Sequence, residues 1–236
     1  MQKVFIIKYG QSIIQYSILL QDRKSLSISV HPNMIVEIKA PLKATRNQIE
    51  KRLQKRASWI LKQLNFFEKL QPLTPLRKYI NGETHLYLGK QYKLKIRKSL
   101  QSDVKIQNGY IIVRTNPQYN QKQIIHTIEE WYKESAKLII GKIFDEMIGE
   151  FQSKRLIPRA FQIRKMKKRW GSCTASKKII LNSELIKAPK NCIKYVIIHE
   201  LCHLKCPNHS SRFYQLQSYF LPNWEFWKNK LELTMS

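Results

Sequence analysis

The chain has 236 residues, which is enough for one large domain or two small ones with a buried core. Its apolar fraction of 43% is that of a globular protein and excludes a disordered chain, and no apolar run is long enough to predict a membrane span. The net charge of +27 favours polyanionic neighbours such as nucleic acid, nucleotides or an anionic membrane face, and a lysine-rich solvated surface explains it equally well.

The N-terminal part begins with a β-rich segment. Apolar and polar residues alternate in short runs over residues 1–40, which predicts strands. Thr45 and Gln48 have the spacing of a capping box, and apolar residues then recur at helical spacing to about residue 70. Pro72 and Pro75 predict a linker after this helix.

Residues 79–115 return to a strand pattern. Two Asn-Gly pairs, at Asn81 and Asn108, supply the residues that tight hairpin turns require. A long helix over about 120–149 follows, because its apolar residues form a stripe at helical spacing. We therefore expect a helix to begin where this β-rich region ends.

The C-terminal part is predicted to be mainly helical. Pro189 suits the first residue of a helix, and Pro207 disfavours helical geometry at Cys206, so this helix is expected to end there. Further elements are expected around it, namely strands over 161–166 and 179–182 and one or two helices over 210–233.

These elements predict an α+β fold in two parts. We expect a β-rich α+β part over residues 1–119 and a catalytic part over residues 120–236. The N-terminus lacks the apolar core of a signal peptide, and the four cysteines form no Cys-x-x-Cys pair and are too few for a disulfide scaffold. A cytoplasmic protein with reduced thiols is therefore expected.

Residues 199–203 read His-Glu-Leu-Cys-His and carry the strongest functional signal. On a helix, His199 and His203 lie on one face, so both imidazoles can reach one metal ion. Glu200 lies nearby without ligating and can act on a metal-activated water as a general base. Zinc, as one ion, is the metal expected for this pattern.

A third ligand is required for a catalytic zinc, which keeps its fourth position open for water. His209 follows His203 by six residues, just beyond the break at Pro207, and this is the spacing of the longer zincin signature. Cys206 is the alternative third ligand, whereas Cys202 falls on another helix face and is expected in the core.

Further motifs surround this constellation, namely Arg169-Trp170-Gly171-Ser172-Cys173, Ile180-Leu181-Asn182, and Asn208-His209-Ser210 with Arg212-Phe213. In combination they resemble the YgjP-like metallopeptidase family, which is similar to SprT-like and other gluzincin-type proteases. The resemblance implies a zincin-like catalytic domain with an active-site helix. It also implies His199, His203 and His209 as zinc ligands and Glu200 as the catalytic base.

The resemblance further implies a peptide substrate that pairs with an edge strand beside the active-site helix. The segment Ile179–Asn182 is the candidate edge, and Trp170, Gly171 and Ser172 are candidates for the cleft wall, although a core anchor and a tight turn explain Trp170 and Gly171 as well. Arg212 is a candidate to stabilise an oxyanion, or else to secure the last loop. The candidate substrate-binding residues are Arg169, Trp170, Gly171, Ser172, Ile180 and Asn182.

No acidic residue occurs from Phe151 to Ser183, and ten Lys and Arg residues lie in this stretch. The stretch leads into the Trp170 motif, so an anionic ligand near the cleft is a second expectation, beside that of a solvated charged face. Three hypotheses follow. The first is a metallopeptidase that acts near nucleic acid, and the second is a zinc-dependent nucleotide hydrolase. The third is a non-catalytic DNA-binding module with a structural zinc site, in which a fourth protein ligand such as Cys206 completes the coordination of the ion.

Overall fold

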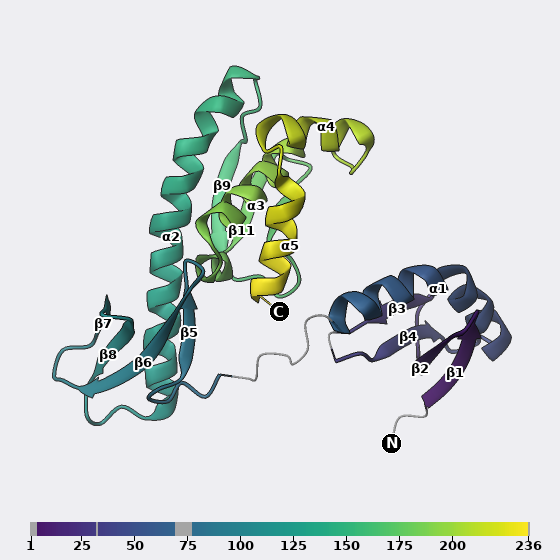
Figure 1. Cartoon of the computed structure of the whole chain (residues 1–236), viewed down its shortest axis with the longest axis horizontal. Helices are drawn as coiled ribbons and strands as arrows, with labels where there is room; N and C mark the ends of the chain where they lie inside the picture. Colours follow the sequence, from purple (N-terminus) through teal and green to yellow (C-terminus); the bar gives the residue numbers. More distant parts are fainter. Residues whose placement is uncertain (1–3, 32, 69–76, 236) are drawn as a thin grey trace. The chain divides into compact units, whose positions relative to one another are not determined.

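The computed structural model describes residues 4–31, 33–68 and 77–235 of an α+β protein, which confirms the predicted fold class. The chain divides into two compact units, Met1–Pro75 and Leu76–Met235 (Figure 1). The linker expected around Pro72 and Pro75 lies outside the described residues. No helix of the described ranges is both long and apolar enough to cross a membrane.

The first unit is a four-stranded sheet with one helix. Its elements are β1 (Val4–Tyr9), β2 (Ser12–Gln21), β3 (Ser27–Val30), β4 (Val36–Pro41) and α1 (Arg46–Glu68). The strand order is β1-β2-β4-β3, with β2 and β4 parallel and the other pairs antiparallel. The predicted capping box is confirmed, because the amide of Gln48 donates to Thr45 Oγ1 at 3.4 Å and the amide of Thr45 donates to Gln48 Oε1 at 3.1 Å.

The second unit begins with the same arrangement. Its first elements are β5 (Thr84–Tyr87), β6 (Lys90–Lys98), β7 (Asp103–Gln107), β8 (Tyr110–Thr115) and α2 (Gln121–Ser153). The strand order β5-β6-β8-β7 repeats that of the first sheet, again with one parallel pair in the middle. A second capping box, formed by Asn120 and Gln123, starts α2. The chain therefore contains one ββββα arrangement twice.

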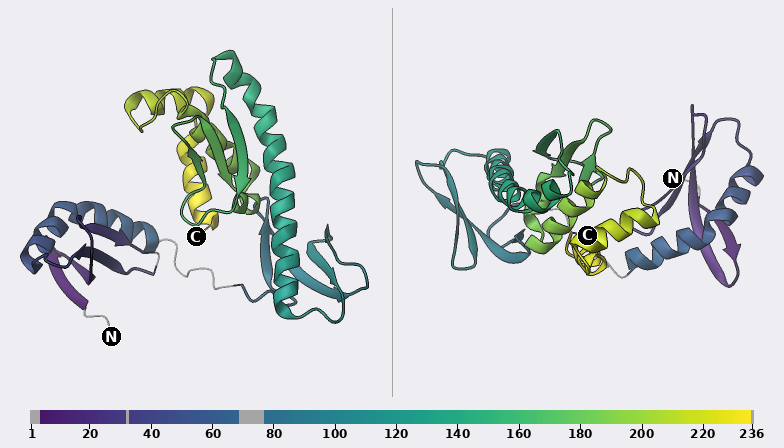
Figure 2. Two further views of the ribbon diagram at one scale, coloured as in Figure 1. Left: turned by 180° about the vertical axis from the view of Figure 1, so that it is seen from behind. Right: turned by 90° about the horizontal axis from the view of Figure 1, so that it is seen from above.

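The boundary between the units differs from the one expected near residue 119, because the second sheet is bonded to elements that follow it. The amide of Leu88 donates to Ile186 O at 2.8 Å, and the hydroxyl of Tyr132 donates to Leu86 O at 2.8 Å. Gly89 lies so close to Pro189 that an added Cβ would be 2.6 Å from the proline Cγ. The β5–β8 sheet thus belongs with α2 and the C-terminal elements (Figure 2).

A three-stranded sheet and three helices complete the second unit. The elements are β9 (Ala160–Arg164), β10 (Gly171–Cys173), β11 (Lys178–Asn182), the 3-10 helix η1 (Ser183–Lys187), α3 (Lys190–Cys202), α4 (Ser211–Phe220) and α5 (Trp224–Met235). The order β10-β11-β9 places β11 in the middle, antiparallel to β10 and parallel to β9. The prediction that Ile179–Asn182 forms the sheet edge is therefore wrong. The edges are β9 and β10, and β10 is the edge strand that contacts α3.

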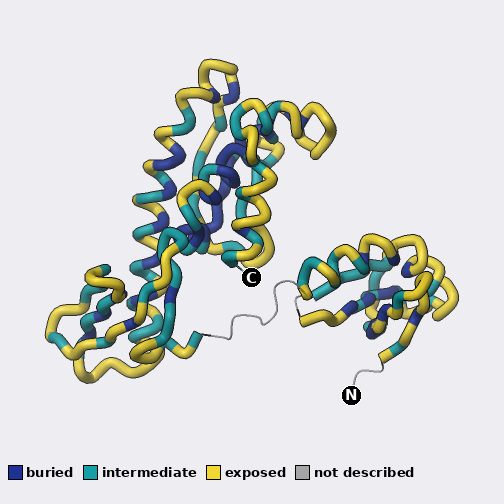
Figure 3. The backbone as a smooth tube through the Cα atoms, in the orientation of Figure 1, coloured by how far each residue is buried: buried dark blue, intermediate teal, exposed yellow. Residues whose placement is uncertain are grey.

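Helix α3, which carries His199 and Glu200, lies at the centre of the second unit. It contacts α2, α4, α5, β10 and β11, and nine of its residues are buried (Figure 3). The helix ends at Cys202 rather than at Cys206. A turn over residues 203–205 follows it, in which the amides of Leu204 and Lys205 donate to the carbonyl oxygens of Leu201 and Cys202, three residues earlier instead of four. This earlier end turns the chain back toward the helix and brings His209 to the face that carries His199.

Candidate metal centre

Three histidines converge at the end of α3. His199 lies in the last turn of the helix, His203 is its C-cap, and His209 lies in the loop before α4. One ring nitrogen from each lies within 4.8 Å of the other two, and the Nε2 atoms of His199 and His209 are 3.0 Å apart. Within the part of the chain that the structure describes, these three form the group that can hold one metal ion.

Two of the imidazoles are held through their other ring nitrogen. His199 Nδ1 lies 2.9 Å from the side-chain oxygen of Gln217, and His203 Nδ1 lies 3.0 Å from the carbonyl oxygen of Cys206. Because both partners are acceptors, each Nδ1 donates its proton and each Nε2 keeps a free lone pair. Such hydrogen bonds orient the ring and set the tautomer that a metal ion requires.

The charge state of the histidines also suits a metal. Burial, followed by the nearby His203, lowers the pKa of His199 to about 4, and burial lowers the pKa of His209 as well. Both rings are therefore neutral at pH 7. The Nε2 of His199 lies 3.0 Å from the Nε2 of His209, so a neutral His209 either donates its Nε2 proton to His199 or, as the other tautomer, offers a second lone pair to a shared cation. The donor set thus fits a metal that prefers imidazole nitrogen, such as zinc.

Glu200 is buried beside this cluster, with 6% of its surface exposed. Burial raises the pKa of its carboxyl to about 7, although the backbone amide of Cys173 and the charge of Arg169 oppose the shift. The carboxyl therefore exchanges its proton readily near neutral pH, which is what general acid-base catalysis requires.

Gly171 makes room for that carboxyl. A Cβ at this position would lie 2.6 Å from both Cγ and Oε1 of Glu200, and the φ angle of Gly171 is not one that requires glycine. The reason for glycine here is thus close packing against Glu200, rather than the tight turn that the sequence also allowed.

An open cleft with a volume of about 660 Å³ leads to the histidines and Glu200. Of the expected substrate-binding residues, Arg169, Gly171 and Ser172 line the cleft. Residues 173–175 and Lys177 line it too, and of these only Lys177 is one of the cations of the acid-free stretch that the sequence analysis expected near the cleft. Two cations of the acid-free stretch, Arg169 and Lys177, therefore lie at the cleft, next to a single carboxylate.

Three expected substrate-binding residues do not line the cleft. Trp170 is half-buried and packs against the core, and Ile180 is buried in the middle strand β11. Asn182 is buried as well, and its side chain donates to the carbonyl oxygens of Met166 and Arg169 at 2.9 Å each. It therefore secures the loop that presents Arg169, which is a supporting role.

Arg212 lies on the exposed side of α4 and does not line the cleft. The structure therefore gives no support for Arg212 as an oxyanion donor. Cys206 presents its carbonyl oxygen to His203, and its thiol is not part of the metal-binding group. Cys202 is fully buried, and burial raises the pKa of its thiol to about 12.

Two residues of α4 that the sequence analysis did not select support the centre. Gln217 is fully buried and holds His199, while the ring of Phe213 lies 5.0, 4.6 and 4.7 Å from the rings of His199, His203 and His209. Their spacing of four residues places them on one face of α4. That spacing was visible in the sequence, but nothing local indicated which helix the face would meet.

Comparison with known proteins identifies a family. A family model described as YgjP-like, metallopeptidase domain, matches residues 24–234. A solved structure, the crystal structure of the metallopeptidase zymogen of Methanocaldococcus jannaschii jannalysin, matches with 23% identity over 39% of this chain and 90% of that chain, at a TM-score of 0.33. A TM-score this low does not establish a common fold. No curated protein matches the chain.

Proposed function

The chain belongs to the YgjP-like metallopeptidase family, and on that premise we propose that it hydrolyses peptide bonds at a single zinc ion held by His199, His203 and His209. The observation that carries the proposal is the position of Glu200, which is buried in the lining of a cleft beside three convergent histidines, two of which have their Nδ1 held by an acceptor. We also propose a cytoplasmic location, which suits four unpaired cysteines.

When bound, zinc supplies Lewis acidity, which lowers the pKa of water and polarises a carbonyl group. Glu200 removes a proton from the attacking water and later delivers it to the nitrogen of the leaving amine. Burial raises the pKa of this carboxyl above its ordinary value, which makes it a stronger base toward the attacking water. Arg169, at the cleft and near Glu200, replaces Arg212 as the candidate for binding negative charge on the substrate.

The edge strand β10 offers a place for the substrate backbone. The amide of Asn182 donates to Trp170 O and the amide of Thr174 donates to Lys178 O, so these alternate positions of the hairpin pair with β11. The backbone groups of Gly171 and Cys173 therefore face away from β11. The amide of Cys173 already interacts with Glu200, so this edge offers a substrate the amide and carbonyl of Gly171 and the carbonyl of Cys173. We propose that an extended peptide binds along this edge.

The decisive test is the variant Glu200→Gln. We expect it to bind one zinc ion per chain and to lose about 10²- to 10⁴-fold in turnover of a labelled unfolded protein, because the amide cannot accept the proton. Glu225→Gln, at an exposed position of α5, is the matched control and should keep full activity. A fully active Glu200→Gln protein would refute the proposed role of Glu200.

A second candidate function is the hydrolysis of a phosphoanhydride bond, instead of a peptide bond, at the same zinc site. Arg169 and Lys177 line the same cleft, so a phosphoanhydride such as a nucleoside triphosphate can also be attracted to it. Incubating the zinc-loaded protein separately with nucleoside triphosphates and with unfolded protein distinguishes the two. Release of phosphate or diphosphate that Glu200→Gln abolishes, without peptide cleavage, would favour the second function.

A further inference from the structure

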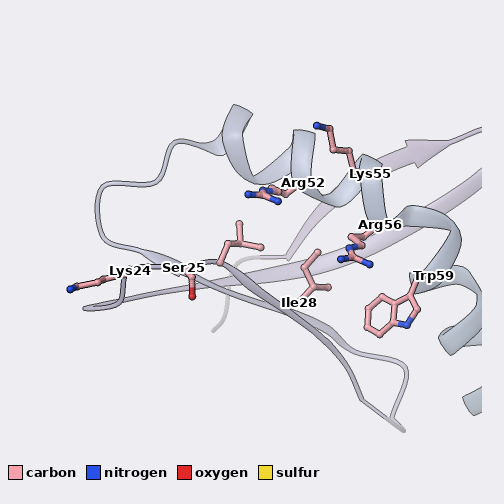
Figure 4. Close-up of a pocket in the computed structure, with 8 residues that line it drawn as sticks. Lys24, Ser25, Ile28, Arg52, Lys55, Arg56 and Trp59 are labelled. Carbon is pink, nitrogen blue, oxygen red and sulfur yellow. The ribbon is translucent and has the colours of Figure 1, made fainter. Parts of the chain in front are cut away.

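The first unit contains a groove that the proposed catalysis does not use. It has a volume of about 670 Å³ and lies between α1 and the segment that leads into β3 (Figure 4). Figure 4 shows Arg52, Arg56 and Trp59 following one another along the helix, with Arg56 beside Ile28 of the facing strand. The lining residues are Lys24, Ser25, Leu26, Ile28, Arg52, Lys55, Arg56 and Trp59.

The groove is strongly basic and its cations are not neutralised. Four of its eight lining residues are Lys or Arg and none is acidic. Among the described residues, no carboxylate lies within ion-pairing distance of Lys24, Arg52, Lys55 or Arg56. The one acid in this part of α1, Glu50, is engaged by Arg46 at 2.7 Å. These cations are therefore available to an anion.

An exposed aromatic side chain continues the row of cations. Trp59 has 41% of its surface exposed, and it is the one large apolar side chain of the groove lining that is classed as exposed. The positions 52, 55, 56 and 59 lie on one face of a helix and span about 10 Å along its axis. The groove thus presents positive charge and a flat π surface side by side.

The fold itself does not require these residue types, as the second copy of the ββββα arrangement shows. Aligned at the N-caps Thr45 and Asn120, the buried Leu53 and Ala57 correspond to the buried Ile128 and Tyr132, so these two core positions agree. The groove positions do not agree, since the residues of α2 that correspond to Arg52, Lys55, Arg56 and Trp59 are Thr127, Glu130, Trp131 and Glu134. Cations at these positions in α1 are therefore not explained by packing.

We propose that this groove binds single-stranded nucleic acid, with Arg52 and Arg56 contacting phosphates and Trp59 stacking on a base. Non-specific single-strand sites combine these two elements, a basic groove that follows the backbone and an aromatic ring on which bases stack. A duplex would leave Trp59 without a base face, because paired bases are already stacked. A membrane surface would need more exposed apolar area than one indole provides.

The experiment measures fluorescence anisotropy of a labelled oligothymidine on the full-length protein across a salt series. Arg52→Ala with Arg56→Ala should weaken binding at least tenfold and reduce the slope of log affinity against log salt by about 1.4, the value for two phosphate contacts on a single strand. Trp59→Ala should weaken binding about tenfold without changing that slope, and Trp59→Phe should retain most of the affinity. All altered side chains are exposed, and melting curves check that the variants are folded.

A matched control distinguishes binding at the groove from binding that depends only on the net charge of the protein. Lys8→Ala with Lys43→Ala removes two exposed cations of the same unit that do not line the groove, and it should leave the affinity nearly unchanged. Equal losses in both double variants, or no binding of oligothymidine, would overturn the proposal. So would binding to phosphatidylserine vesicles, but not to oligothymidine, that depends on Trp59. Because binding is measured without turnover, the result is independent of the proposed peptidase activity.

Discussion

Glu200 has room for its carboxyl group because position 171 is a glycine. The two residues are far apart in the sequence, and the contact arises because β10 lies against α3. The amide of Cys173, two residues further along β10, lies near the same carboxyl and acts to lower its pKa. A short edge strand therefore both makes space for the proposed base and acts on its pKa.

Gly171→Ala tests this packing at the scale of one residue. An added Cβ would lie 2.6 Å from Glu200 Cγ and Oε1, so the carboxyl must move away from its place at the cleft. We expect turnover to fall at least tenfold while zinc stoichiometry is retained, as measured by peptide cleavage and metal analysis.

Gly149→Ala is the matched control for that substitution. Gly149 lies in α2, and nothing lies within 4 Å of an added Cβ. This variant should keep full activity and gain about 0.5–1 kcal/mol of stability, because alanine loses less backbone entropy than glycine in a helix. If Gly171→Ala is as active as Gly149→Ala, close packing does not position the base.

At the scale of elements, α4 is the support of the metal centre although it contributes no proposed ligand. Phe213 packs against all three imidazole rings, and Gln217, one turn later, accepts a hydrogen bond from His199. Both side chains are fully buried. Helix α3 carries His199 and Glu200, and α4 holds the ring of His199 in its orientation.

Gln217→Ala tests the role of α4. Without its acceptor, His199 Nδ1 loses the partner that fixes the ring and its tautomer, so zinc affinity should fall about 10- to 100-fold. Competition with a chromophoric chelator measures the affinity. Gln215→Ala, at an exposed position of the same helix, should bind zinc like the unaltered protein. Equal affinity of the two variants would show that Gln217 does not position His199.

At the scale of the whole molecule, the chain consists of two units with separate cores. The core of the first unit includes Leu53 of α1, and the core of the second includes Ile128 of α2. These two residues occupy the same position relative to the capping boxes of their helices, and both are fully buried. They offer a matched pair of substitutions, one in each copy of the ββββα arrangement.

Leu53→Ala should destabilise the first unit by about 2–5 kcal/mol through the cavity it leaves, while zinc affinity and turnover stay unchanged. Ile128→Ala should destabilise the second unit by a similar amount and weaken zinc retention under mild denaturant. Hydrogen exchange resolved along the chain measures protection in each unit. Loss of protection in both units from either substitution would show that they unfold as one cooperative block.

The sequence by itself determined the features that depend on local periodicity. Residues four apart meet on a helix, so His199, Glu200 and His203 could be grouped without a structure. The capping box of Thr45 and Gln48 was located from the sequence, whereas for α2 only the approximate bounds were predicted and its capping box was not. The α+β class followed from the same patterns.

Only the tertiary structure decided the rest, because it depends on contacts between distant parts of the chain. It made β10 rather than β11 the sheet edge, joined the second sheet to α2 and η1, and brought Gln217 to His199. Strand order and the partner of a helix face follow from how the elements pack. The hydrophobic periodicity of a strand or a helix shows which of its faces is buried, but it does not specify the element that covers this face.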